Sequence, residues 1–325
     1  MKKRSLVWAA LAATQIVTLP FAAQAGDSEA STKETKVVKT AEKAPPLPLH
    51  TIEGVGGIVI TPVAYLVNPG PAGTTFGLPS ASATYVKANQ KNVETLALTE
   101  TLFGRVELGY GASRFGIGSL VDDVKDLTTI QIPDSVTVHN VNARVLALPE
   151  GSFGLALPAL TVGVSYKYND GIADINQKLG GALTTIGYDS NQGVDYTVTA
   201  TKAFPHLFGR PLLITGGLRV SKAAQLGYLG FGDKYRPTFE GNIAYGLNDW
   251  LWLAGEFRGK ANPYQQITNP VKGGNLIQRE DNWWTVGAAF VINPHATVTV
   301  GWGHFGPVLN TDENKAVAIQ AKYEF

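Results

Sequence analysis

Charged side chains at alternate positions of apolar segments are the residues best placed to do chemistry in this 325-residue sequence. In a β-strand such charges share one face, opposite the apolar residues between them. The set comprises Glu107, Arg144, Lys167, Asp195, Arg219, Glu240, Glu256 and Arg258, followed by Lys322 and Glu324 near the end of the chain. Its two signs are almost balanced. Lining one lumen, these side chains would form either a hydrated passage with mixed charge or a lattice of ion pairs that fills the interior.

Residues suited to catalysis or metal binding are few and scattered. For hydrolysis, Ser113 and His304 are the nearest candidates, but no motif surrounds either residue. His139 and His304 fall near strand ends and could meet, yet no spacing supplies the three or four ligands that a metal site needs. Two acidic clusters in predicted loops could bind Ca²⁺ through oxygens, although neither has the spacing of a calcium loop. These clusters are Asp122, Asp123 and Asp126, and Asn169, Asp170, Asp174 and Asn176. We therefore expect no catalytic residue, no metal and no cofactor.

The elements that must position the charged residues are strands. From Gly77 onward the chain contains about twelve amphipathic segments of roughly ten residues, the length of a tilted strand that crosses a bilayer. They lie at 77–87, 93–102, 105–116, 135–148, 159–168, 194–204, 212–222, 236–247, 251–260, 282–292, 296–306 and 316–325. In one of them Leu160 and Val162 alternate with Thr161 and Gly163. This period of two predicts an all-β fold, a transmembrane antiparallel up-and-down β-barrel with lipid outside and a charged lumen.

The connections between the segments support this prediction. Counted back from the C-terminus, long and short connections alternate almost throughout, as expected for loops at one end of a barrel and turns at the other. The hairpin 88–92 is short where a long loop is expected. The parity slips near Asn140–Arg144, which suggests a bulge. Tryptophans at strand ends predict aromatic girdles at the two membrane interfaces. They are Trp250, Trp252, Trp283 and Trp284.

The last ten residues, Ala316 to Phe325, alternate strictly and end the chain on an aromatic side chain. This ending resembles the closing strand of Gram-negative outer-membrane β-barrels. The resemblance implies that Tyr323 and Phe325 form an assembly signal, read by the barrel-assembly machinery, and that the barrel contacts outer-membrane lipid.

The N-terminus has the three parts of a secretory signal peptide. Basic residues 2–4 precede an apolar stretch at 6–21, and Ala23-Gln24-Ala25 fits a cleavage site. We assign residues 1–25 to the signal peptide. Residues 26–50 are polar and then rich in proline, which predicts a disordered periplasmic tail. The absence of cysteine suits a chain that crosses an oxidising compartment.

The stretch 51–76 is apolar and rich in glycine, with Thr61-Pro62 interrupting it, and we expect either a plug in the lumen or an extra strand. Together with the barrel body, 77–325, it resembles a proteobacterial family of predicted outer-membrane proteins of unknown function. The run Gly56 to Ala64 is also similar to the opening of barrel proteins encoded with exopolysaccharide-secretion systems. Neither resemblance brings a catalytic motif.

These features predict a protein of the Gram-negative outer membrane with both termini in the periplasm. We expect a narrow channel or transport pore for a small solute. An accessory component of envelope or exopolysaccharide export and an outer-membrane enzyme remain as alternatives. The formal net charge of +1 offers no strongly basic face, so we expect no nucleic-acid partner.

Overall fold

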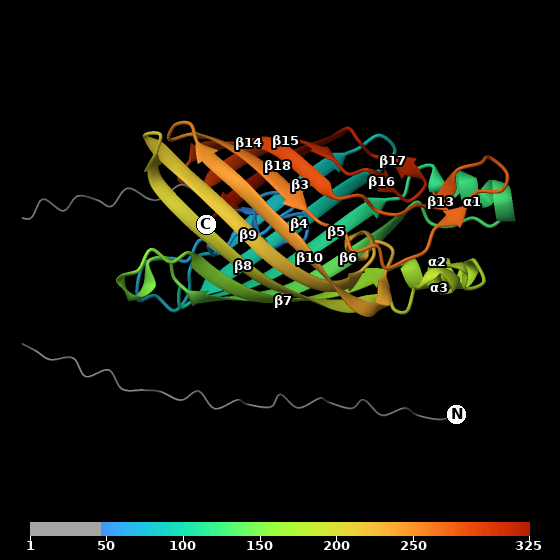
Figure 1. The fold of residues 1–325 in the computed structure, drawn as a ribbon, viewed down its shortest axis with the longest axis horizontal. Helices are drawn as coiled ribbons and strands as arrows, with labels where there is room; N and C mark the ends of the chain where they lie inside the picture. Colours follow the sequence, from blue (N-terminus) through green and yellow to red (C-terminus); the bar gives the residue numbers. More distant parts are fainter. Residues whose placement is uncertain (1–46) are drawn as a thin grey trace, which may run out of the picture. The chain divides into compact units, whose positions relative to one another are not determined.

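A closed barrel of antiparallel strands forms the body of the protein (Figure 1). The computed structural model describes residues 47–325, so the expected signal peptide and most of the expected tail lie outside the described residues. Twelve strands follow one another around the barrel in chain order, and the last strand pairs with the first to close it. Closure leaves no sheet edge, so every strand can satisfy its backbone hydrogen bonds inside the wall.

The twelve strands coincide with the twelve segments expected from the sequence. Their bounds are β3 (Ser80–Lys87), β4 (Asn92–Leu102), β5 (Val106–Gly116), β6 (Ser135–Leu148), β7 (Ala159–Asp170), β8 (Gln192–Leu207), β9 (Arg210–Ala223), β10 (Phe231–Gly246), β11 (Leu251–Arg258), β14 (Trp283–Asn293), β15 (Ala296–His304) and β18 (Ala316–Glu324). No helix in the described part of the chain is both long and apolar enough to cross a membrane.

Side-chain alternation separates an apolar outside from a polar inside. On β10, for example, Glu240 and Asn242 are buried, whereas Phe239 is 74% exposed and Ile243 is 49% exposed. Exposed aliphatic and aromatic residues recur on the outer face of the other strands. Because a monomeric soluble protein rarely exposes apolar surface of this extent, the pattern is that of a wall in contact with lipid. The all-β barrel expected from the sequence is confirmed.

The prediction of a bulge near Asn140–Arg144 is wrong. β6 pairs with β5 in one unbroken register from Ser135 to Val145, and the irregularity lies later, between Leu146 and Leu148. Val136 and Val138 share the inward face with the polar residues of β6 and are buried. The inward face of β6 therefore continues without interruption and changes only in chemistry. It carries valines toward the loop connection, where the lumen is apolar, and polar residues in the middle of the barrel.

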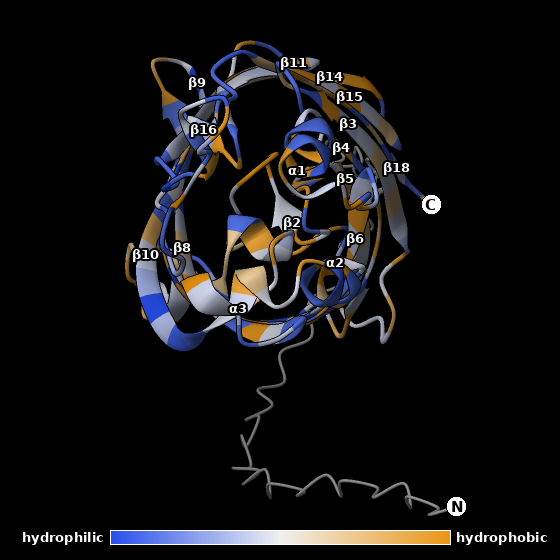
Figure 2. Ribbon diagram, turned by 90° about the vertical axis from the view of Figure 1, so that its right-hand side faces the viewer, coloured by the Kyte–Doolittle hydropathy of each residue, from blue (hydrophilic) through white to orange (hydrophobic). Residues whose placement is uncertain are grey.

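The two ends of the barrel differ, and we call them the turn end and the loop end. Short turns gather at the turn end, where β8 meets β9 and β14 meets β15. Longer loops at the loop end carry the small elements α1 (Leu120–Thr128), α2 (Ile172–Lys178), α3 (Ala182–Ile186), η2 (Gln225–Gly227), β12 (Ile267–Thr268), β13 (Asn275–Ile277), β16 (Pro307–Val308) and β17 (Thr311–Asp312). Figure 2 looks onto this end and shows the helices across the mouth of the barrel.

The short hairpin after β3 is covered by neighbouring loops, which explains its length. Lys91 is buried, and its Nζ donates to the Ile117 carbonyl at 2.8 Å and to Asn310 Oδ1 at 2.7 Å. The Gln90 amide donates to the Glu313 carboxylate. A longer hairpin here would displace the two loops that close over it.

Most of the stretch before β3 lies inside the barrel, whereas its last residues, 69–76, are largely exposed and Phe76 pairs with Leu102 at the end of β4. We call residues 47–68 the inner segment. It forms a small two-stranded sheet, β1 (Leu49–His50) with β2 (Gly56–Gly57), which pairs with no strand of the wall. The expected tail therefore ends before Leu49, because Leu49 and His50 are buried within the lumen. The expectation of an extra wall strand is also wrong, because the segment packs as a plug (Figure 2).

Only two of the four strand-end tryptophans face outward. Trp250 is 52% exposed and Trp284 is 41% exposed, as a girdle requires. Trp283 is buried, and Trp252 packs against the internal apolar core. Each is one residue away from an outward-facing neighbour, and that single step places it on the inner face.

Candidate functional site

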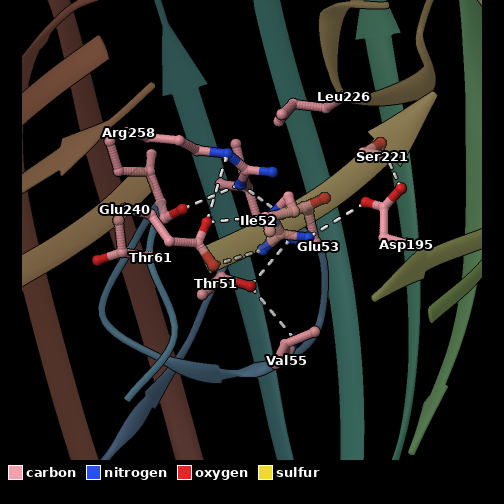
Figure 3. Close-up of polar contacts among 12 residues, drawn as sticks. Thr51, Ile52, Glu53, Val55, Thr61, Asp195, Ser221, Leu226, Glu240 and Arg258 are labelled. Atoms are coloured by element: carbon pink, nitrogen blue, oxygen red, sulfur yellow. Dashed lines mark hydrogen bonds and ion pairs between the residues drawn. The ribbon is translucent and has the colours of Figure 1, made fainter. Parts of the chain in front are cut away.

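A buried cluster of charges occupies the middle of the lumen (Figure 3). Its cations are Lys167 on β7, Arg219 on β9 and Arg258 on β11, and its acids from the wall are Asp195 on β8 and Glu240 on β10. All five side chains were predicted to face inward. Each is no more than 4% exposed, so the cluster is removed from bulk water.

The geometry of the cluster follows from strand pairing. Glu240 lies directly opposite Arg258 on the neighbouring strand, with a separation of 3.9 Å between Oε2 and the Arg258 Nε. Arg219 donates to both oxygens of Glu240, through Nε at 3.0 Å and Nη2 at 3.2 Å. On its other side, Asp195 accepts from Lys167 at 2.6 Å and from Arg219 at 3.1 Å. The wall alone thus supplies three cations and two carboxylates.

The third carboxylate belongs to Glu53 of the inner segment. It pairs with Lys167 and with Arg258, and its Oε2 lies 3.6 Å from the Arg219 Nη2. With Glu53 in place, the cluster holds three charges of each sign. A buried charge without a partner is costly, so this balance ties the inner segment to the wall.

Reasoning from the sequence missed Glu53, although a signal was present. It is the only charged residue in the otherwise apolar stretch 51–76. A lone acid there is costly unless a cation meets it inside the barrel. The full set of predicted inward charges is nearly balanced, whereas the central cluster of the wall has one acid fewer than cations. The overall balance therefore gave no indication that an acid from elsewhere was needed.

A second ion pair clamps the inner segment from β5 and β6. Arg144 donates to Glu107 through Nε at 3.0 Å and Nη2 at 2.6 Å, a two-pronged contact. The remaining Arg144 donor, Nη1, reaches the Val63 carbonyl at 2.6 Å. Glu107 accepts from the backbone amides of Gly56 at 3.1 Å and Val67 at 2.8 Å. The pair is therefore saturated by the inner segment and offers no free charge.

Glu256 binds backbone rather than a cation. Its carboxylate accepts from the amides of Val59, Ile60 and Thr61 at distances from 2.8 to 3.2 Å, and from the hydroxyls of Thr61 and Thr285 at 2.7 Å. Within the described chain no Lys, Arg or His forms an ion pair with it. Successive backbone amides that point to one place form a good anion-binding site. Here the anion is the Glu256 carboxylate of the wall.

The last two predicted lumen charges pair with each other near the turn end. Lys322 donates to Glu324 at 2.5 Å, and both are buried. The candidate assembly residues behave differently, because Tyr323 is 46% exposed and Phe325 is 55% exposed on the outer face. Their rings meet edge to face, with centroids 5.1 Å apart. Their role in assembly stays a prediction.

The candidates for hydrolysis do not converge. Ser113 faces the lumen, where its hydroxyl pairs with Tyr228 at 2.5 Å and Thr95 at 2.8 Å. His304 lies on the outer face, and its ring stacks on Trp284 with centroids 5.5 Å apart. The barrel wall separates the two side chains, so they cannot form a nucleophile and base.

The other metal candidates have local partners as well. His139 on β6 bonds to the hydroxyl of Tyr110 on β5 at 2.8 Å, while His304 lies on β15, five strands from β6 around the barrel. Asp123 pairs with Lys272 at 2.8 Å, and Asn169 Oδ1 accepts from the Ile172 amide at the start of α2, at 3.1 Å. In residues 47–325 no group of three or more His, Asp or Glu residues has the geometry of a metal site.

At the loop end, two buried lysines have pKa values below the usual range for lysine. Burial lowers the pKa of Lys91 to about 8, and the Glu313 carboxylate only partly offsets that effect. Burial also lowers the pKa of Lys260 to about 8, although Glu280 lies 2.7 Å away. The Lys260 Nζ sits 3.6 Å above the centre of the Trp283 ring, which stabilises the charged form.

The fold defines a twelve-stranded barrel of the outer-membrane type with a filled lumen. The chain belongs to the family described as Protein of unknown function (DUF3034), whose model matches residues 48–322. That match includes the inner segment as well as the barrel.

Solved structures similar to this chain are also barrels. The KdgM porin has a TM-score of 0.46 at 11% identity, and the match covers 76% of this chain and 99% of that chain. The NanC porin has a TM-score of 0.43 at 11% identity, with 76% and 98% covered. LpxR from Salmonella typhimurium has a TM-score of 0.44 at 10% identity, with 76% and 100% covered. Comparison with curated proteins gave no match.

Proposed function

We propose that the protein is a gated outer-membrane pore for a small solute, with the turn end in the periplasm. In this account the inner segment is the gate, and the described conformation is the closed state. The observation that carries the proposal is how the segment is held. Its backbone-to-backbone hydrogen bonds are internal, such as Ile52 to Val59 at 2.8 Å, and its hydrogen bonds with the wall each involve a side chain on at least one side.

This mode of attachment makes release compatible with an intact barrel. Removing a wall strand would break a ladder of backbone bonds and open the barrel to lipid. Removing the inner segment exchanges ion pairs and side-chain hydrogen bonds for water, while all twelve strands remain paired. The wall would then present Lys167, Arg219 and Arg258 to a hydrated passage, as a pore for polar solutes requires.

Closure has a second layer at the loop end. Apolar side chains of α1, α2, α3 and β13 join Val136 of the wall in one buried cluster. This cap contains few polar anchors to the strands, so its opening costs mainly apolar contacts. A solute therefore meets a polar gate in the middle and an apolar cap at the mouth.

Liposome swelling with a small neutral sugar tests the proposal. The full mature chain should swell liposomes slowly, and a variant that lacks residues 47–68 should swell them much faster. Both proteins must first resist SDS until heated, because that property reports a closed barrel. If the folded deletion variant leaves liposomes as tight as the full chain does, the inner segment is not the gate and the proposal fails.

A further inference from the structure

One sector of the inner wall is lined by small residues instead of charges. Around the barrel from β11 to β18, register places Ala254 opposite Gly287, Gly287 opposite Gly301, and Gly301 opposite Ala318. All four lie on the inward parity of their strands. The inner segment meets this sector with Ile58, Val59 and Val63. Small residues facing aliphatic ones across the lumen leave space that neither side fills.

That space is an apolar cavity of about 420 Å³ between the inner segment and β11, β14, β15 and β18. Engineered apolar cavities of about 150 Å³ already hold benzene, so this volume suits a substantially larger molecule. Val86, Phe305 and Ala316 line its part nearest the loop end, and Trp252 lines its part toward the turn end. The only charged residue in the lining is Glu256, whose carboxylate is already saturated by the inner segment.

Two polar groups without partners also line this cavity. Trp252 Nε1 and Thr299 Oγ1 are both buried, and neither has a hydrogen-bond partner among the described residues. They belong to one row of the inner wall, because Trp252 pairs with Ala289 on one side and Thr299 pairs with Ala289 on the other. Buried polar groups are almost always bonded, so an orphaned pair beside a cavity indicates a missing partner.

We propose that this cavity binds an uncharged single-chain amphiphile, an aliphatic chain with one oxygen-bearing head such as an alcohol, ketone, aldehyde or ester. The chain fills the apolar space, and the oxygen accepts from the Trp252 indole and bonds the Thr299 hydroxyl. An indole N–H can only donate, so the head must supply an acceptor. The lining contains no cation, so a carboxylate head would be buried without a partner. The inference stands on the cavity itself and does not depend on gating.

Equilibrium dialysis tests the proposal with radiolabelled 1-decanol, decane and decanoate as probes. The full mature chain in lipid nanodiscs should retain a saturable excess of 1-decanol, one per barrel, over the same nanodiscs without protein. Decanoate should be retained more weakly than 1-decanol. No saturable excess, or equal retention of decanoate, would overturn the proposal.

Cavity filling supplies the decisive variant. A Cβ at Gly301 would meet its nearest atom, the Val286 carbonyl, at 3.4 Å, which is ordinary contact. Gly301→Leu should therefore fold, fill the space and abolish the excess of both 1-decanol and decane. Val300→Leu, on the lipid side of the same strand, is the matched control and should bind as wild type. Undiminished binding by folded Gly301→Leu places the probe elsewhere and overturns the assignment.

Head-group recognition is tested separately. Thr299→Val removes one hydrogen-bonding group and nearly preserves the shape of the side chain. It should weaken 1-decanol binding about three- to tenfold, the range of one neutral hydrogen bond, and leave decane unchanged. Equal effects on both probes would contradict the assigned head site. If 1-decanol binds only after residues 26–46 are deleted, that part of the chain is the occupant of the cavity in the full protein. This result would overturn the proposal.

Discussion

Replacing Glu53 by Gln tests the gate at its most sensitive contact. The side chain keeps its size and loses its charge, so Lys167, Arg219 and Arg258 face only Asp195 and Glu240. One positive charge is then uncompensated in a buried cluster. Breaking a buried pair from one side typically costs 3–5 kcal/mol.

That cost falls on the closed state alone. When the inner segment leaves, water hydrates the three cations, and residue 53 is solvated whether it is Glu or Gln. At about 1.4 kcal/mol per factor of ten, the open fraction should rise by roughly 100- to 4,000-fold. Single-channel recording in planar bilayers measures this fraction directly, with rare openings for the wild type and frequent openings for Glu53→Gln.

Two further variants control the experiment. Glu94→Gln removes an exposed acid whose partner, Arg114, lies 3.8 Å away, and should change the open fraction less than about fivefold. Adding Lys167→Met to Glu53→Gln restores equal numbers of cations and acids and should reverse most of the effect. An open fraction for Glu53→Gln equal to that of wild type would refute the reasoning.

Three other outcomes follow from the structure. Ile243→Arg places a charge on the lipid face of β10 and should destabilise the barrel by about 2–4 kcal/mol if the site is near the midplane, whereas Ile243→Leu should be near neutral in the same urea titration. Phe325→Ala should lower the outer-membrane yield in cells far more than the Tm of refolded protein, because an exposed ring contributes less than the 1.5–3 kcal/mol of a fully buried one; equal yields would exclude the assembly role. Folding lowers the pKa of Lys91 to about 8, so between pH 8 and 10.5 the unfolded chain binds more protons and stability should rise with pH. Lys91→Met should reduce that rise in thermal unfolding, with Lys260 contributing the remainder, and an unchanged slope would show that Lys91 is not one of its sources.

Local patterns were sufficient to predict the wall. Each strand carries its own period of two, so Glu240 and Arg258 could be placed on the inward face without knowing any partner strand. Trp252 and Trp283 were misplaced although the same pattern covers them. Both have the chemistry of a membrane girdle, but Trp252 has the inward parity of Glu256 and Arg258. Trp283 has the inward parity of Thr285, so alternation rather than residue chemistry decides the side.

The filled lumen could be predicted only in part. Alternation indicates that Glu107 and Arg144 face inward, but it contains no information on what they meet there. Their partners, the Val63 carbonyl and the amides of Gly56 and Val67, are backbone groups of a distant segment without regular structure. Such contacts depend on tertiary packing, which local periodicity does not encode. The lone charge of Glu53 was the one visible clue.

The most direct test of the gate uses a reversible lock. Asn242 on β10 donates to the Thr61 hydroxyl of the inner segment at 2.9 Å, and the chain has no native cysteine. A Glu53→Gln protein that also carries Thr61→Cys and Asn242→Cys should open often when reduced. Once oxidised, with the disulfide verified by mass, its openings should cease and return on adding reductant. Equal conductance in the oxidised and reduced states would contradict the claim that the inner segment closes the pore.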